Sequence, residues 1–232
     1  MHPLDNPIWQ SLITTHAHFA ETCKRARKFP HEVNVLAGFA EPSHENYDSL
    51  ASLLRPEEQI GLFLQEPPDL PAGWTVIRNA PLLQMLHEKS TALPERQPEF
   101  VQLSHADVPE MLALTKLTNP GPFRPRTYEM GDYFGVRIDG TLAAMAGERL
   151  RLPGYTEISA VCTHPEHLGH GYASALIAKL VDGICKGGET PFLHVLPSNT
   201  RAIQVYERLG FTKRTTLHVV GLRHDNFPNP DK

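Results

Sequence analysis

The chain has 232 residues, 41% of them hydrophobic and 21% charged, which is enough for a soluble core as one large domain or two small ones. Its formal net charge of -4 at pH 7 argues against a general binder of nucleic acid or of anionic membranes, because such proteins need positive surfaces. The three cysteines are too few and too widely spaced for a disulfide framework or a paired-cysteine metal site, and they favour a reducing compartment.

The first residues, from Met1 to Trp9, lack the basic and apolar blocks of a signal peptide. No stretch of the sequence approaches the roughly 18 apolar residues of a membrane span. We therefore expect a cytoplasmic protein that binds neither membrane nor nucleic acid.

Residues 1–95 contain short strand patterns, such as Gly61–Leu64 and Trp74–Ile77, but no catalytic spacing. The segment Ala92–Pro98 carries two prolines and several charges and is the predicted linker. The sequence thus predicts a smaller α/β domain of unclear role at 1–95 and a larger domain at 96–232.

The larger domain reads as alternating strands and helices. In chain order the predicted elements begin with a strand at Phe100–Leu103, a helix around 108–114 and three strands at Tyr133–Ile138, Thr141–Leu150 and Tyr155–Thr163. They continue with a helix from about Gly171 to Ile184, a strand at Pro191–Leu196, a helix from about residue 200 to Leu209 and a strand at Phe211–Leu222. Asp139-Gly140 is a strong hairpin signal between the first two of the three central strands. This order predicts an α/β fold, a mixed sheet with helices on both faces.

The stretch from Ile158 to Leu180 carries the most information about function. A β-branched strand ends at His164-Pro165, and glycines at 169 and 171 precede an amphipathic helix. Glycine lets a ligand approach the backbone, and the first free N–H groups of a helix point at whatever lies there. This pattern predicts an anion site, and a pyrophosphate fits it.

Two blocks in order and register, AVCTHPEHLGHGYASAL and VLPSNTRAIQVYERLGF, resemble the GCN5-related N-acetyltransferase (GNAT) superfamily, most closely its FR47-like branch, over roughly residues 99–222. The resemblance implies a GNAT fold in the C-terminal half, with a sheet whose fourth and fifth strands splay apart. Residues 1–95 are then a smaller α/β domain or a degenerate copy of the same fold.

The resemblance also implies acetyl-CoA as co-substrate, with no metal. The residues it assigns to the cofactor are Val161, Cys162 and Thr163 through their main chain, Gly169, His170, Gly171, Tyr172, Ala173 and Ser174 at the pyrophosphate, and Asn199 before the next helix. One residue departs from the family motif, because Leu168 stands where a polar or basic side chain is usual. His167 or His170 is the candidate substitute when protonated.

Three residues are candidates for proton transfer, which amine acetylation needs at the amine and at the departing thiolate. Tyr206 resembles the helix tyrosine that many family members use as the acid that protonates the thiolate. The simpler role is core packing, because Tyr206 shares its helix face with apolar side chains. Glu157 lies fourteen residues before Gly171, as the base does in histone-acetylating members, and half-burial is expected to raise its pKa. His194 occupies the place where some relatives carry a glutamate; the simpler role of a strand histidine is a structural hydrogen bond.

His164, His167 and His170 are spaced by threes, but they flank a proline and a glycine turn and lack acidic or cysteine co-ligands, so no metal site is predicted. The leading hypothesis is an N-acetyltransferase that acts on a small-molecule amine, an amino acid or a peptide by direct attack in a ternary complex, with a homodimer as one option for its assembly. The alternative is a catalytically weak acyl-CoA-binding, sensing or structural protein.

Overall fold

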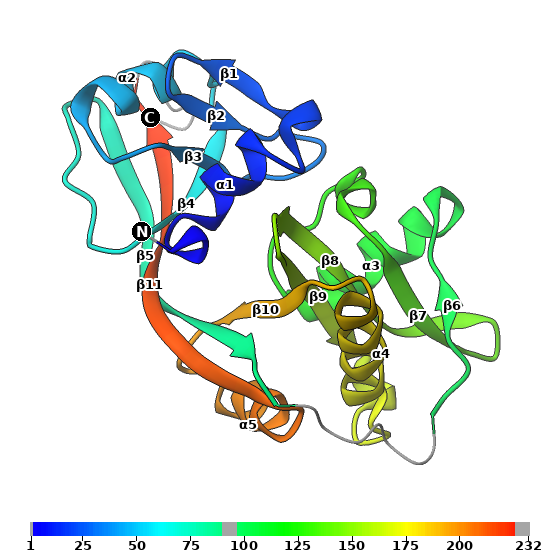
Figure 1. Ribbon diagram of the computed structural model, residues 1–232. Coiled ribbons are helices and arrows are strands. Elements are labelled where there is room, and N and C mark those ends of the chain that lie inside the picture. The colour runs from blue at the N-terminus through cyan, green and yellow to red at the C-terminus, as the bar shows by residue number, and fades with distance from the viewer. Residues whose placement is uncertain (1, 90–96, 226–232) are drawn as a thin grey trace.

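The structure, a computed structural model, describes residues 2–89 and 97–225, and it contains a three-stranded and an eight-stranded β-sheet (Figure 1). No helix in these two ranges is long and apolar enough to cross a membrane. The expected mixed α/β fold is confirmed.

The elements of the first 89 residues are short, apart from the last strand. They are η1 Pro3–Asp5, α1 Pro7–Ile13, η2 Ala17–Phe19, β1 Glu21–Cys23, β2 Ala26–Lys28, β3 Ala37–Phe39, α2 His44–Ala51, β4 Gln59–Leu64 and β5 Trp74–His87. The strands expected at Gly61–Leu64 and Trp74–Ile77 are confirmed, and β5 continues ten residues further than expected, to His87. Pro81 is tolerated inside β5 because β5 pairs with β10 only between Leu83 and Leu86, which leaves the earlier part of that edge unpaired.

The elements after the gap follow the predicted order. They are β6 Val101–Gln102, η3 His105–Asp107, α3 Val108–Thr118, η4 Thr127–Met130, β7 Tyr133–Ile138, β8 Thr141–Leu152, β9 Tyr155–Thr163, η5 Pro165–His167, α4 Tyr172–Lys186, β10 Thr190–Val195, α5 Thr200–Arg208 and β11 Phe211–His224. Asn119 ends α3 in a left-handed conformation, a common helix stop.

The large sheet has the strand order β4-β11-β5-β10-β9-β8-β7-β6. β5 lies between β10 and β11, and its ladder with β11 runs from the pair His87/Phe211 to the pair Trp74/His224. In Figure 1 these two long strands form a twisted ribbon that joins the two lobes of the molecule. A strand from the N-terminal segment is therefore built into the middle of the sheet.

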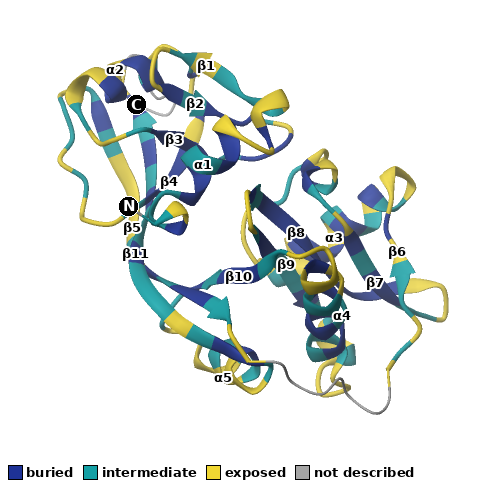
Figure 2. Ribbon diagram, viewed as in Figure 1, coloured by how far each residue is buried: buried dark blue, intermediate teal, exposed yellow. Residues whose placement is uncertain are grey.

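The two faces of the sheet are covered by different elements. On one face, α4 and α5 pack against Ile158, Leu193 and Val195. On the other, α3 packs against Tyr133 and Cys162. Figure 2 shows that buried residues follow the central strands and the side of α4 that faces them. Helices lie on both faces, as the chain order predicted.

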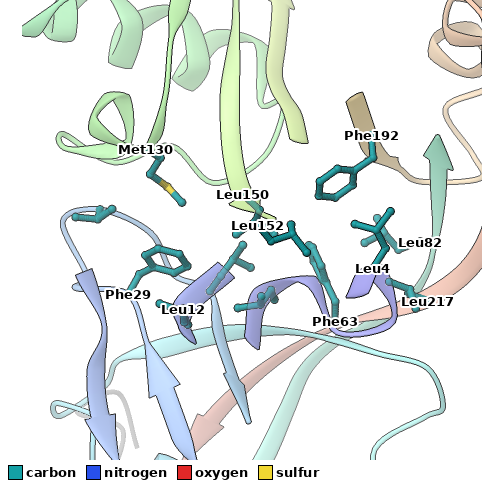
Figure 3. Packing of buried hydrophobic residues seen from close by; sticks show 13 residues of the cluster. Leu4, Leu12, Phe29, Phe63, Leu82, Met130, Leu150, Leu152, Phe192 and Leu217 are labelled. Atoms are coloured by element: carbon teal, nitrogen blue, oxygen red, sulfur yellow. The ribbon is translucent and has the colours of Figure 1, made fainter. Parts of the chain in front are cut away.

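A shared hydrophobic cluster joins the N-terminal segment to the rest of the sheet (Figure 3). It brings Leu4 and Phe63 against Phe192 on β10 and Leu150 and Leu152 on β8, all of them buried. Residues far apart in the sequence therefore form one core on the sheet face opposite α4.

The predicted domain boundary between residues 95 and 96 lies outside the described residues, as does most of the predicted linker Ala92–Pro98, so the division into two domains stays a prediction. The eight-stranded sheet takes β4 and β5 from before that boundary and its other strands from after it.

Candidate active site

The predicted anion site lies at the N-terminus of α4. Gly169 and Gly171 have φ values of +85° and +79°, which L-residues with a side chain rarely adopt. A Cβ atom at either position would meet no atom within 4 Å, so space is open in front of both. Gly171 is the N-cap residue and no side chain caps the helix. The amide groups of the first turn are therefore available to an anion.

The ladder between β9 and β10 is short. Its three pairs end at Glu157 and Phe192. Beyond them β10 pairs with β5, as far as Val195, while β9 continues to pair with β8 as far as Thr163. Figure 1 shows β10 diverging from β9 toward β5. Within the described chain, no strand pairs with the edge of Ile158–Thr163 that faces β10. The two strands therefore separate here, as the resemblance implied.

A β-bulge interrupts β9 between Ile158 and Thr163, where β9 pairs with β8 alone among the described strands. The register with β8 shifts between Met145 and Gly147, and Ala160 has a φ of +52°, a strained value for a residue with a side chain. In a regular strand Ile158, Ala160 and Cys162 would share one face, as alternation along the sequence predicts, and the structure shows that this prediction is wrong. Ile158 packs with the α4 core and Cys162 with the α3 core, because the extra residue reverses the alternation.

Glu157 lies at the last paired position of β9 and is completely buried. Its Oε2 and Oε1 atoms accept hydrogen bonds from Nε and Nη2 of Arg149 at 2.8 and 2.6 Å. A second register shift, between Glu148 and Arg151 on β8, places both Arg149 and Leu150 opposite Glu157. The bulge thus brings two consecutive residues of β8 to the side of the sheet that carries Glu157. Arg149 makes the ion pair from there, and the amide of Leu150 donates to Oε2 of Glu157 at 3.3 Å.

The protonation of Glu157 is set by this pairing. Burial alone raises the pKa of a carboxyl, but the charge and hydrogen bonds of Arg149, together with His194, lower the pKa of Glu157 to about 2. The expected raised pKa is therefore wrong, because the sequence did not reveal the buried guanidinium. Glu157 is a carboxylate at neutral pH.

The structure brings Glu157 and His194 together. Nδ1 of His194 lies 2.6 Å from Oε1 of Glu157, and its Nε2 lies 3.0 Å from Nε2 of Gln84 on β5. The imidazole side chain is 2% exposed and packs against the rings of Phe63 and Phe192 at centroid distances of 4.6 and 5.7 Å. His194 therefore sits beside the point where β9 and β10 separate.

Tyr206 lies on α5, on the other face of the sheet. Its side chain belongs to the core that contains Leu193 and Phe211, with ring centroids of Tyr206 and Phe211 6.1 Å apart. Burial raises its pKa to about 12, so the hydroxyl keeps its proton at neutral pH. It makes no hydrogen bond to the described residues.

Two further predicted residues, Asn199 and His170, make contacts with their own neighbours in the chain. Asn199 caps α5 by accepting a hydrogen bond from the amide of Ala202 at 3.2 Å. His170 stacks on Tyr172, with ring centroids 5.6 Å apart. Within 2–89 and 97–225, no group of three or more histidine, cysteine or acidic side chains is placed to hold a metal ion.

Burial raises the pKa of the Cys162 thiol to about 11, so Cys162 carries no nucleophilic thiolate at neutral pH.

Two open surface hollows, of about 370 and 310 Å³, lie on α5 and beside α3, and neither is lined by Glu157, His194 or Tyr206. The side chains of Glu157 and His194 are only 0% and 2% exposed, so the pair is enclosed by the protein.

Three residues of this site were not predicted from the sequence: Arg149 and Gln84, which contact the Glu157–His194 pair, and Arg214, which contacts Gln84. Arg149 lies between Glu148 and Arg151 at the charged end of an apolar strand, and a charged residue in a strand predicted to be buried was a usable signal. For Gln84 no local signal existed, because β5 meets β10 only through long-range pairing.

Comparisons with known proteins identify the family of the chain. The sequence profile of the FR47-like protein family matches residues 133–220. A solved structure from Novosphingobium aromaticivorans, assigned to the GNAT family of acetyltransferases, is 41% identical, with 97% of this chain and 100% of that chain covered and a TM-score of 0.89.

The chain belongs to the GNAT family.

Other relatives support the assignment of this GNAT protein. The ribosomal protein bS18-alanine N-acetyltransferase of Escherichia coli K12 is 27% identical over 135 residues, which are 56% of this chain and 86% of that protein. A GCN5-related N-acetyltransferase of Kribbella flavida shares the fold, with a TM-score of 0.59 and 19% identity over 93% of this chain and 95% of that one. The protein is an N-acetyltransferase, and the resemblance seen in its sequence is confirmed.

Proposed function

We propose that this GNAT protein transfers an acetyl group from acetyl-CoA to a primary amine by direct attack in a ternary complex. The observation that carries the proposal is the opening between β9 and β10. It begins at Glu157 and Phe192, beside the buried Glu157–His194 pair, and β9 leads from there toward the N-terminus of α4. When bound, acetyl-CoA supplies an activated thioester, so the protein has to orient the reactants and move protons.

The binding roles follow from groups that the fold leaves open. The pyrophosphate is held by the loop Gly169–Gly171 and the amides of Tyr172, Ala173 and Ser174, where the helix dipole favours negative charge. The main chain of Val161–Thr163 lines the pantetheine arm, and Asn199 lies near it at the start of α5. Leu168 is half exposed and offers no charge, which leaves His167 and His170 as the basic side chains of the loop.

We assign proton acceptance from the amine to His194 and orientation of its ring to Glu157. Both oxygens of Glu157 are committed, since Oε1 accepts from Arg149 and His194, and Oε2 accepts from Arg149 and the amide of Leu150. A carboxylate with so low a pKa is a poor proton acceptor. A neutral imidazole accepts a proton readily near pH 7, directly or through a water molecule.

Tyr206 supplies the proton to the departing thiolate in this proposal. The amine nitrogen forms a bond to the carbonyl carbon, the carbon–sulfur bond breaks, and the sulfur takes the hydroxyl proton. The raised pKa keeps Tyr206 protonated until the thiolate forms. Its burial among apolar side chains also keeps water from competing as the donor.

We propose a peptide or protein α-amino group as the first acceptor class to test, ahead of amino acids and polyamines. The support is the Escherichia coli relative, which is named for acetylating an alanine of a ribosomal protein. We further propose a cytoplasmic location, which the free state of Cys23, Cys162 and Cys185 favours.

The test is release of CoA thiol from acetyl-CoA in the presence of peptides that begin with alanine, free amino acids or polyamines. We expect release with at least one amine, and a loss of about a hundredfold in kcat/KM for His194→Gln at neutral pH. Unchanged turnover in His194→Gln would remove its assigned role. Binding of acetyl-CoA without release for any amine would instead support the sensing alternative.

A further inference from the structure

Gln84, which no part of the mechanism above uses, is completely buried on β5 and lies directly opposite His194 in the ladder with β10. Its Oε1 lies 2.7 Å from Nη1 of Arg214. Its Nε2 lies 2.9 Å from the carbonyl oxygen of Leu4 and 3.0 Å from Nε2 of His194. One amide side chain therefore contacts three separate elements of the fold.

These neighbours fix the orientation of the Gln84 amide. A guanidinium only donates hydrogen bonds, so the atom that faces Arg214 must be the amide oxygen. A backbone carbonyl only accepts, so the atom that faces Leu4 must be the amide nitrogen. A flipped amide would break both contacts at once in a buried site, which is costly. Gln84 can thus present only an N–H group to His194.

The orientation of Gln84 in turn fixes the tautomer of His194. Because Gln84 donates to Nε2 of His194, that nitrogen accepts and carries no proton. The single ring proton lies on Nδ1, which donates to the carboxylate of Glu157 at 2.6 Å. Glu157 and Gln84 therefore select the same tautomer from opposite sides of the ring.

Arg214 is itself held in place. Its Nη2 pairs with Oδ1 of Asp5. The other carboxylate oxygen of Asp5 accepts from the amide of His2 at 2.9 Å, within the first turn of the chain. The charges around Gln84 and His194 are Arg214 with Asp5 on one side and Arg149 with Glu157 on the other, so each cation has its own anion.

We propose that Gln84 is a positioning residue for acetyl transfer, which keeps the lone pair of His194 on Nε2 and holds the ring in its proton-accepting form. The proposal rests on the role assigned to His194 above. The proposal also assigns a function to residues 1–95, whose sequence contains no recognisable site. Leu4, Asp5 and Gln84 all belong to this segment and complete the surroundings of His194. The amine, or the water that relays its proton, takes the place of the Gln84 amide at Nε2, while Leu4 and Arg214 continue to hold Gln84.

The direct test reads the tautomer without any turnover. The full-length protein, labelled with ¹⁵N at histidine, is measured by long-range ¹H–¹⁵N correlation at neutral pH, and His194→Gln identifies the signal of His194. We expect the pattern of an Nδ1–H tautomer with an unprotonated Nε2. An Nε2–H tautomer, or a doubly protonated ring, overturns the proposal whatever the enzyme's activity.

The functional test replaces Gln84 by glutamate, which has the same shape but presents an acceptor to Nε2. We expect Gln84→Glu to add a proton at Nε2, because the ring then lies between two carboxylates and donates to both. We expect this change to lower kcat by at least about tenfold and to shift the pH profile of kcat, with little change in the Kd for acetyl-CoA. Gln204→Glu, the same change at an exposed position of α5, is the matched control and should behave as wild type.

The outcomes separate the two proposals. If Gln84→Glu folds and leaves both the tautomer and the pH profile unchanged, Gln84 does not position His194. If the tautomer is as expected but His194→Gln retains full turnover, the assignment of His194 as proton acceptor fails, and the role of Gln84 in the reaction fails with it. If Gln84→Glu does not fold, the wild-type spectrum still decides the tautomer.

Discussion

The guanidinium of Arg149 forms a two-pronged hydrogen-bonded ion pair with the carboxylate of Glu157, at 2.6 and 2.8 Å, inside the β-sheet. The side chain of Glu157 is 0% exposed and that of Arg149 is 11% exposed. A bulge in β8 places Arg149 and Leu150 together opposite Glu157. It anchors the carboxylate against which His194 is oriented.

Removal of Arg149 is expected to destabilise the protein strongly. Arg149→Met leaves the Glu157 carboxylate buried without its cation, which costs about 3–5 kcal/mol of unfolding free energy, measured by urea denaturation. The double variant Arg149→Met with Glu157→Gln should recover a large part of this loss, because the amide is neutral and its oxygen still accepts from His194. Arg126→Met, which breaks the exposed pair with Glu129, is the control and should cost less than about 1 kcal/mol. A loss of the same small size in Arg149→Met would contradict the importance given to this ion pair.

Stability is expected to fall between pH 6.5 and pH 4 because of His16. Its Nδ1 lies 2.9 Å from the hydroxyl of Ser11 and its Nε2 lies 3.0 Å from the carbonyl of Met130, so the neutral ring is fully bonded. Burial, helped by the charges of His18 and Arg151, lowers the pKa of His16 to about 4. The unfolded chain therefore takes up a proton below pH 6.5 that the folded protein refuses until about pH 4, and the free energy of unfolding decreases across this window by about 3 kcal/mol.

Urea denaturation of the wild type and of His16→Gln at several pH values checks this. The variant should show a shallower slope between pH 4 and pH 6.5, whatever its stability at pH 7. His44→Gln, at an exposed position of α2, should keep the wild-type slope. An unchanged slope in His16→Gln would show that another group governs this window.

Tyr206→Phe is expected to lower turnover by about a hundredfold and to leave the Kd for acetyl-CoA nearly unchanged, because only the proton for the thiolate is lost. Stability should change little, since the hydroxyl makes no hydrogen bond to the described part of the chain. Tyr47→Phe is a matched control: Tyr47 is also buried with an unpaired hydroxyl, but it lies in the core beneath α2. Equal turnover in both variants would exclude Tyr206 as the acid.

The sequence predicted the C-terminal elements, the glycine turn before α4 and the separation of two strands, because each rests on local patterns or on the family resemblance. It did not predict how β5 enters the sheet, since the contact of Gln84 with His194 joins residues 110 positions apart. It also missed the two bulges, of which one reverses the direction of Cys162 relative to a regular strand and the other places Arg149 and Leu150 together opposite Glu157. The pKa of Glu157 depends on Arg149 in the neighbouring strand, so an expectation based on burial alone gave the wrong direction of shift.

Acetyl-CoA binding at the N-terminus of α4 is the claim on which the proposed function depends. Gly171 and Gly140 offer a matched comparison, because their φ values are +79° and +80°, and a Cβ atom added to either would have no atom within 4 Å, but Gly140 lies in the hairpin turn between β7 and β8. Alanine at either position adds similar backbone strain, on the order of 1 kcal/mol. In the proposed complex, only the methyl group at position 171 would meet the pyrophosphate.

Calorimetric titration with acetyl-CoA of the wild type, Gly171→Ala and Gly140→Ala tests this claim most directly. We predict saturable binding to the wild type and to Gly140→Ala, and an affinity at least about tenfold weaker for Gly171→Ala, equivalent to about 1.4 kcal/mol. Failure of the wild type to bind acetyl-CoA, or equal binding by all three proteins, would contradict it.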